Sequence, residues 1–148
     1  MKYFYRLYQL CVFLPLFIVA TILTALITII GCRFGNGNFW GYYPGKIWSR
    51  FTTFLLFLPI HVEGREYLDK SQSYVFVANH QGAFDIFLIY GFLDRNFKWM
   101  LKMGLRKIPF VGMACEYAHF IFIDKRGPSK IRHSYEQARE ILKEGMSL

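Results

Sequence analysis

The apolar residues at the start of the chain form one long uninterrupted segment. No charged side chain occurs between Leu7 and Cys32. As a helix, these 26 residues would extend about 39 Å, longer than the roughly 30 Å hydrocarbon core of a bilayer. The pattern predicts a helix over residues 3–30, kinked at Pro15 and ended by Gly31. A cleaved signal peptide is the alternative, but the segment is too long and no A-x-A-like cleavage site follows it.

A second apolar segment follows a loop rich in glycine and aromatic residues, 35–44. It predicts a helix over 45–58 that Pro59 stops. The apolar run within it, 51–60, is too short to span a bilayer, but it could enter one leaflet or lie in the interface. Because basic residues flank the first helix on both sides, the charges give no clear orientation. A helical hairpin in one leaflet therefore fits the pattern as well as a full span does.

The rest of the chain alternates strand-like and helix-like patterns. We expect strands near 61–65, 74–79, 98–102 and 120–123, and helices near 83–93, 109–118 and 129–144. Such alternation predicts an α/β fold with some parallel strand pairing. The last three residues, 146–148, look like the approach to a further strand. We therefore divide the chain into a membrane-associated two-helix region, 1–60, and an α/β domain, 61–148.

Composition and charge narrow the classes of partner. Hydrophobic residues make up 54% of the chain and the net charge is +8, with nine basic and three acidic side chains between Asp94 and Arg132. Such a cluster could bind nucleic acid, anionic headgroups or a phosphorylated substrate. A nucleic-acid motif is not recognisable and would not explain the apolar segment, so we expect lipid phosphates and no nucleic acid. The three cysteines are isolated and the four histidines lack metal-ligand spacing, so neither a disulfide nor a metal site is predicted.

One candidate for chemistry stands after the apolar run 74–78, where Asn79-His80 is followed by Asp85. Five helical residues rotate by about 140°, so His80 and Asp85 cannot share one helix face. They can meet if His80 ends a strand, Gly82 turns the chain, and Asp85 lies in the first turn of a helix. An aspartate held ionised there by the helix dipole could accept one imidazole N–H and leave the other nitrogen as a base.

The motif itself holds no serine or cysteine, so the nucleophile would be a hydroxyl of the substrate. The alternative for His80 is a structural histidine that only forms a hydrogen bond at the end of a strand.

This histidine–aspartate motif resembles the first motif of the glycerolipid acyltransferases, in particular the 1-acyl-sn-glycerol-3-phosphate acyltransferases. A second resemblance follows at the expected distance. Lys102, Pro109 and Gly112 lead to Phe-Ile-Phe-Ile-Asp-Lys-Arg at 120–126, similar to the Phe-Ile-Asp-Arg block of that family. The apolar two-helix region also resembles the membrane-binding element of the family. The resemblance thus implies a glycerolipid-acyltransferase-like α/β domain behind a membrane-associated helical hairpin.

The resemblance also implies a reaction. His80 would take the proton from the free hydroxyl of lysophosphatidate, with Asp85 as its orienting partner. The acyl chain would come from acyl-CoA or acyl-carrier protein, the product would be phosphatidate, and neither a metal nor a cofactor is implied. Lys102 is the best candidate for contact with the acceptor's phosphate. Lys125 stands where the family has arginine and cannot make its bidentate fork, and Arg126 is the third candidate. Each of the three could equally be a solvated surface residue.

The family continues with a strand carrying a Phe-Pro-Glu-Gly-Thr-Arg block, which is absent from these 148 residues. We therefore expect the sequence to be the N-terminal portion of an acyltransferase. Two alternatives remain: an acyltransferase for a different lyso-lipid, and an inactive membrane-bound fragment whose basic face binds lipid. In each case we expect an integral or monotopic membrane protein at the cytoplasmic face of the cell membrane.

Overall fold

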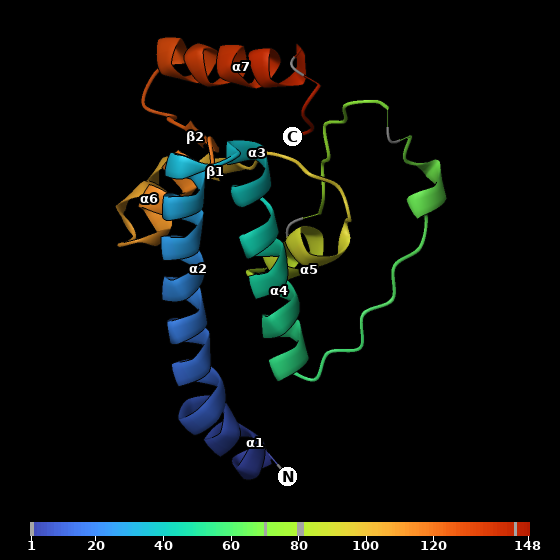
Figure 1. Cartoon of the computed structure of the whole chain (residues 1–148), viewed down its shortest axis with the longest axis vertical. Coiled ribbons are helices and arrows are strands. Elements are labelled where there is room, and N and C mark those ends of the chain that lie inside the picture. The colour runs from blue at the N-terminus through green and yellow to red at the C-terminus, as the bar shows by residue number, and fades with distance from the viewer. Residues whose placement is uncertain (1, 70, 80–81, 144) are drawn as a thin grey trace.

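The N-terminal segment forms one long helical rod in the computed structural model, which describes residues 2–69, 71–79, 82–143 and 145–148 (Figure 1). The rod consists of α1 (Lys2–Tyr8), a π-helical segment (Gln9–Phe13) and α2 (Leu14–Phe34). In the π-helical segment, the Leu14 amide donates to the carbonyl of Gln9, five residues back. The sequence predicts a kink at Pro15, because proline has no amide hydrogen to donate within a helix. The irregular part of the rod is the π-helical segment, which ends two residues before Pro15.

The prediction that Gly31 ends this helix is wrong, because α2 continues to Phe34. Gly31 instead allows Trp40 to pack closely against the helix. A Cβ atom at residue 31 would lie 2.4 Å from Cγ of the Trp40 ring, so the ring or the helix would have to shift.

The second helix of the N-terminal region is α4 (Tyr43–Leu55), preceded by the short α3 (Gly37–Trp40), which was not predicted. The Asn36 side chain caps α3 by accepting hydrogen bonds from the amides of residues 38 and 39. Helix α4 ends three residues before the predicted Leu58. It lies beside α2 (Figure 1), and the indole N–H of Trp48 donates to the hydroxyl of Thr21 at 2.9 Å.

The remaining helices lie within three residues of their predicted bounds. They are α5 (Phe84–Phe92), α6 (Val111–Tyr117) and α7 (Pro128–Lys143), with two 3-10 turns, η2 (Arg65–Tyr67) and η3 (Met103–Lys107). Two short strands, β1 (Met100–Lys102) and β2 (Ile121–Ile123), pair in parallel. In the part of the chain that the structure describes, neither 61–65 nor 74–79 is assigned as a strand, so those two predictions are not met.

Residues 147–148 nevertheless form strand-like hydrogen bonds with two neighbouring segments of the chain. Ser147 forms a parallel bridge with Phe97. On the other side, the Leu148 amide donates to the carbonyl of Tyr74 at 2.9 Å, and the Phe76 amide donates to the carbonyl of Leu148 at 2.8 Å. The strand-like character expected for 146–148 thus has a counterpart in hydrogen bonds. The predicted α/β class is met only in part, because the described chain is mostly helical and its strands are few and short.

The core joins the two predicted parts of the chain. Tyr42, Tyr90 and Phe97 are buried together, and the Tyr90 hydroxyl donates to the carbonyl of Gly41 at 2.9 Å. Burial raises the pKa of the Tyr90 hydroxyl, which keeps it protonated as a donor. A second cluster places Ala138 of α7 and Leu148 against Ile121 of β2. The division at residue 60 remains a prediction, and packing is continuous across it.

Candidate active site

Asp85 lies in the first turn of α5, where the sequence placed it. Its carboxylate oxygen Oδ2 accepts a hydrogen bond from the amide of Gly82 at 3.0 Å, and its own amide donates to the carbonyl of Gly82 at 3.3 Å. The turn at Gly82 therefore holds the carboxylate at the positive end of the helix dipole, which favours its ionised form. His80 lies outside the described residues, so the geometry of the His80–Asp85 pair stays a prediction.

Aromatic packing places the start of α5 against the two apolar helices. Phe87, two residues after Asp85, lies with its ring centroid 5.0 Å from that of Trp48 in α4 and 6.0 Å from that of Phe17 in α2. Because these rings belong to the long apolar rod and its neighbour, the first turn of α5 lies next to the part of the molecule best suited to lipid.

The three predicted substrate-binding residues line one groove of about 740 Å³. Lys102 ends β1, and Lys125 and Arg126 follow β2. Since the strands are parallel and Lys102 lies opposite Ile123, residues after both strands come to the same edge. The structure thus brings these three cations together, and their role in binding substrate stays a prediction.

The sequence reasoning missed two further cations in the groove, Arg106 and Lys107. Both lie in η3, the tight turn directly after Lys102. Both belong to the basic cluster between Asp94 and Arg132, and no local sequence signal set them apart from the other cations of that cluster.

The cations of the groove differ in their partners. Arg126 binds the Asp124 carboxylate through Nε at 2.9 Å and its terminal nitrogen at 2.7 Å, and Lys130 lies 3.4 Å from the same carboxylate. These hydrogen bonds, with Arg126 the main cause, hold the pKa of Asp124 well below its usual range. For Lys102, Lys107 and Lys125, by contrast, no ion pair is found among the described residues. The groove is therefore positive, with three lysines available to an anion.

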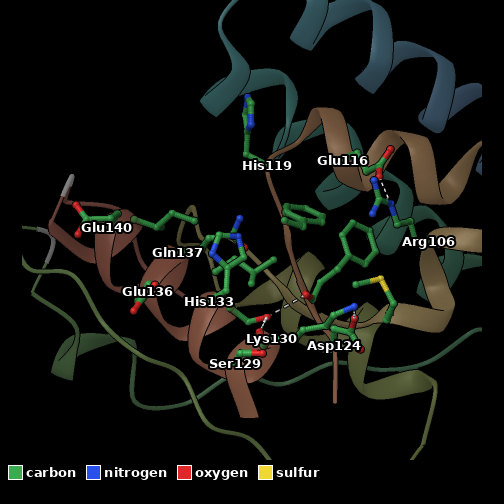
Figure 2. A pocket seen from close by; sticks show the side chains of 16 residues that line it. Arg106, Glu116, His119, Asp124, Ser129, Lys130, His133, Glu136, Gln137 and Glu140 are labelled. Atoms are coloured by element: carbon green, nitrogen blue, oxygen red, sulfur yellow. Dashed lines mark hydrogen bonds and ion pairs between the residues drawn. The ribbon is translucent and has the colours of Figure 1, made fainter. Parts of the chain in front are cut away.

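A larger pocket of about 1140 Å³ adjoins the groove between α6 and α7 (Figure 2). Arg106 and Asp124 line both, and Arg106 is ion-paired with Glu116 on the wall of the pocket. Histidines and carboxylates of the pocket include His119, His133 and Glu140. Within the described ranges, however, the structure has no cluster of three or more histidine, cysteine or acidic side chains that could hold a metal ion.

Comparison with known proteins identifies the family. The family described as Acyltransferase matches residues 59–148, which is more than half of the chain. The chain therefore belongs to the acyltransferase family. Within that family it is similar to members whose names describe them as glycerolipid acyltransferases.

Three relatives show the range of similarity. The 1-acyl-sn-glycerol-3-phosphate acyltransferase LPAT1 of Arabidopsis thaliana chloroplasts is 29% identical over 108 residues, which cover 72% of this chain and 30% of the relative. An uncharacterised acyltransferase of Schizosaccharomyces pombe is 30% identical over a region that covers 72% of this chain and 39% of that relative. The 1-acyl-sn-glycerol-3-phosphate acyltransferase of Cocos nucifera is 27% identical over a region that covers 78% of this chain and 36% of that relative. The chain thus spans about a third of the length of these relatives. No solved structure matches it.

Proposed function

We propose that this protein takes part in acyl transfer from a thioester, acyl-CoA or acyl-carrier protein, to the free hydroxyl of lysophosphatidate, giving phosphatidate. The observation that carries the proposal is the family match across 59–148, which contains both motifs. The names of the Arabidopsis and Cocos relatives support the choice of a 1-acyl-glycerol-3-phosphate as acceptor.

In this proposal His80 is the general base and Asp85 its orienting partner. His80 accepts the hydroxyl proton of the acceptor while the hydroxyl oxygen bonds to the thioester carbonyl carbon. The carbon–sulfur bond then breaks, and the proton passes from His80 to the departing thiolate. The hydrogen bond from Gly82 to Asp85 supports this role, because it holds the carboxylate at the start of α5 in one orientation.

The acceptor's phosphate is assigned to the groove at the ends of β1 and β2. Lys102 and Lys125 line the groove without a carboxylate partner among the described residues, whereas Arg126 shares its guanidinium with Asp124. A dianionic phosphate fits such a groove because charge-assisted hydrogen bonds are the strongest that side chains can offer it. Arg126 would contribute with the N–H groups that Asp124 does not use.

We also propose that the N-terminal helices bind the membrane. An 18-residue window of the helix over Tyr3–Phe34 has a mean hydropathy of 2.8, and the helix is long and apolar enough to cross a bilayer by length and composition. Many of its apolar side chains are exposed, among them Val19, Leu23 and Ile27. Exposed apolar surface of this extent is unfavourable in water and favourable in lipid.

The test is acyl transfer by the protein that carries this chain, with lysophosphatidate and a radiolabelled acyl-CoA in mixed micelles. His80→Ala should lower kcat by at least about a thousandfold, and Asp85→Asn by about as much, since each removes the base or its orientation. The matched control is Asp69→Asn, an exposed carboxylate in a surface turn, which should retain normal transfer.

Wild-type transfer by His80→Ala would contradict the proposed base. Absence of transfer by the unaltered protein, together with binding to lipid vesicles, would favour the lipid-binding alternative instead. The two outcomes are separated by measuring turnover and vesicle binding on the same preparations.

A further inference from the structure

Three cations surround one carboxylate at the junction of α4, α5 and the chain that follows α4. We call Lys46, Arg50, Arg65 and Asp94 the Asp94 cluster. Lys46 Nζ is bonded to the Asp94 carboxylate, one terminal nitrogen of Arg50 lies 3.6 Å from it, and one of Arg65 lies 4.0 Å from it. The hydrogen bond from Lys46 is the main cause that holds the pKa of Asp94 below its ordinary value, so the carboxylate is charged at neutral pH.

Backbone carbonyls at the end of α5 fix both guanidinium groups of the cluster. Arg50 Nε donates to the carbonyl of Gly91 at 2.7 Å, and a terminal nitrogen of Arg65 donates to the carbonyl of Phe92 at 2.7 Å. Asp94 itself has a left-handed backbone, with φ of 60°, which turns its carboxylate toward the cations. The cluster is therefore held in place before any ligand arrives, and little side-chain entropy would be lost on binding.

The cluster has more positive charge than its internal partner can neutralise. Three cations face one carboxylate, which leaves a net charge of +2. The side chains of Arg50 and Arg65 are 47% and 46% exposed. Each guanidinium has five N–H donors, of which the contacts above use only a part. The remaining donors open to the surroundings and suit the oxygens of a phosphate.

An exposed apolar row lies beside these cations on the same helix. Ile47, Phe51 and Phe54 follow one face of α4 at helical spacing and are 66%, 38% and 72% exposed. Lys46 and Arg50 lie one position before the first two of these residues. Since successive helix positions differ by about 100°, cations and apolar side chains form adjacent rows. A surface with an apolar row beside a positive one fits the boundary between lipid tails and headgroups.

We propose that the Asp94 cluster is a binding site for the phosphate groups of anionic phospholipids in the bilayer surface. Lys46 and Arg50 lie on α4, Arg65 lies in η2 and Asp94 follows α5, and none of the four lines the groove at the ends of β1 and β2. The cluster has no part in the acyl transfer proposed above. It places Lys46, Arg50 and Arg65 at headgroup depth while Ile47, Phe51 and Phe54 enter the tail region beside α2. The protein thereby selects membranes with a negative surface.

The experiment measures binding of the full chain to vesicles in a sedimentation assay. One set of vesicles is pure phosphatidylcholine, and in the other about a third of the lipid is phosphatidylglycerol. Arg50→Gln and Arg65→Gln should each weaken binding to the anionic vesicles about fivefold, the ratio expected for one cation near such a surface. Binding to pure phosphatidylcholine should not change. Asp94→Asn should strengthen anionic binding by a similar ratio, and asparagine tolerates the left-handed backbone at this position.

Two controls separate charge from structure. Arg50→Lys keeps the charge but loses the guanidinium geometry toward Gly91, and it should retain most of the anionic preference. Arg132→Gln removes one charge on α7, where Arg132 is exposed and paired with Glu136, and it should bind as the wild type does. Equal losses in Arg132→Gln and Arg50→Gln would overturn the proposal, because only net charge would then matter. Equal losses in Arg50→Lys and Arg50→Gln would overturn it in favour of a purely structural role.

A further arm distinguishes headgroups from free anions. Inorganic phosphate should displace the protein from vesicles no better than sodium chloride at the same ionic strength, and specific displacement by phosphate would contradict a bilayer site. Asp85→Asn, expected to lack acyl transfer, should bind anionic vesicles normally. Failure of the headgroup site and failure of the proposed function are therefore seen in different measurements.

Discussion

At the scale of single residues, the groove beside β1 and β2 holds two kinds of cation. Arg126 already faces the Asp124 carboxylate, whereas Lys102 and Lys125 face the groove without a carboxylate among the described residues. An incoming phosphate would compete with Asp124 for Arg126 but not for the lysines. The two lysines should therefore contribute to the affinity for the phosphate even though their side chains are flexible.

Lys102→Met tests this difference. Loss of one charge-assisted hydrogen bond to phosphate should raise KM for lysophosphatidate about tenfold or more and leave KM for the acyl donor unchanged. Steady-state kinetics with each substrate varied in turn measures both values. Lys143→Met is the matched control, because Lys143 pairs with Glu140 at the exposed end of α7. An unchanged acceptor KM in Lys102→Met would remove Lys102 from the site.

The sequence predicted the position of Asp85 because a glycine turn and a helix start depend on neighbouring residues. It also singled out Lys102, Lys125 and Arg126 through motif spacing. The bond between Arg126 and Asp124 could not be predicted, since alternate side chains after a strand can point to either face. Motif spacing gives positions along the chain, whereas ion pairing depends on side-chain directions that only the fold sets.

At the scale of elements, α4 and α5 approach closely because Gly45 has no side chain. A Cβ atom at residue 45 would lie 2.3 to 2.6 Å from atoms of the Tyr90 side chain, which is itself packed against Tyr42 and Phe97. The contact between these helices connects the apolar two-helix region to the part of the chain that bears the motifs. A change in this one contact should therefore affect both regions together.

Gly45→Ala should lower the free energy of unfolding by about 1–3 kcal/mol, because the methyl group forces the Tyr90 ring or the helix to shift. Denaturant unfolding in detergent micelles measures the effect. Gly127→Ala is the control, because a Cβ atom there meets no atom of the described residues within 4 Å and the change should stay within about 0.5 kcal/mol. Equal stability of the two variants would contradict the packing described for α4 and α5.

The helices were predicted better than the strands. Periodicity over ten or more residues identified α7, with Ala138 and Ile141 on its packed face, to within a residue at each end. The strand predicted over 61–65 has five residues, and nothing in so short a segment distinguishes a strand from extended chain. Strand pairing depends on partners far along the chain, and no local pattern records them.

At the scale of the whole molecule, the exposed apolar surface of α2 and the positive Asp94 cluster should make separate contributions to the membrane binding proposed above. The apolar part should act on any bilayer, whereas the cluster should act on anionic ones only. A change in the apolar part therefore has a different signature from the changes proposed above.

Leu23→Asp places a charge on α2 at a side chain that is 53% exposed. It should weaken binding to neutral and anionic vesicles alike by about a hundredfold, the ratio that corresponds to about 3 kcal/mol for a charge at the centre of a membrane helix. Vesicle sedimentation with both lipid compositions measures it. Tyr135→Asp on α7, where Tyr135 is 63% exposed, should have no such effect. Normal binding by Leu23→Asp would show that α2 does not enter the bilayer.

The hydrogen bonds of Leu148 have a consequence for the way the chain is made. Residues 147–148 lie between 74–76 and 97–98, so their neighbours leave the ribosome long before they do. Until residue 148 emerges, both neighbouring segments present unpaired amide and carbonyl groups that can join a wrong partner. Early attachment of the apolar helices to a membrane would keep these half-built edges apart from those of other nascent chains. Translation beside the membrane should therefore raise the yield of folded protein.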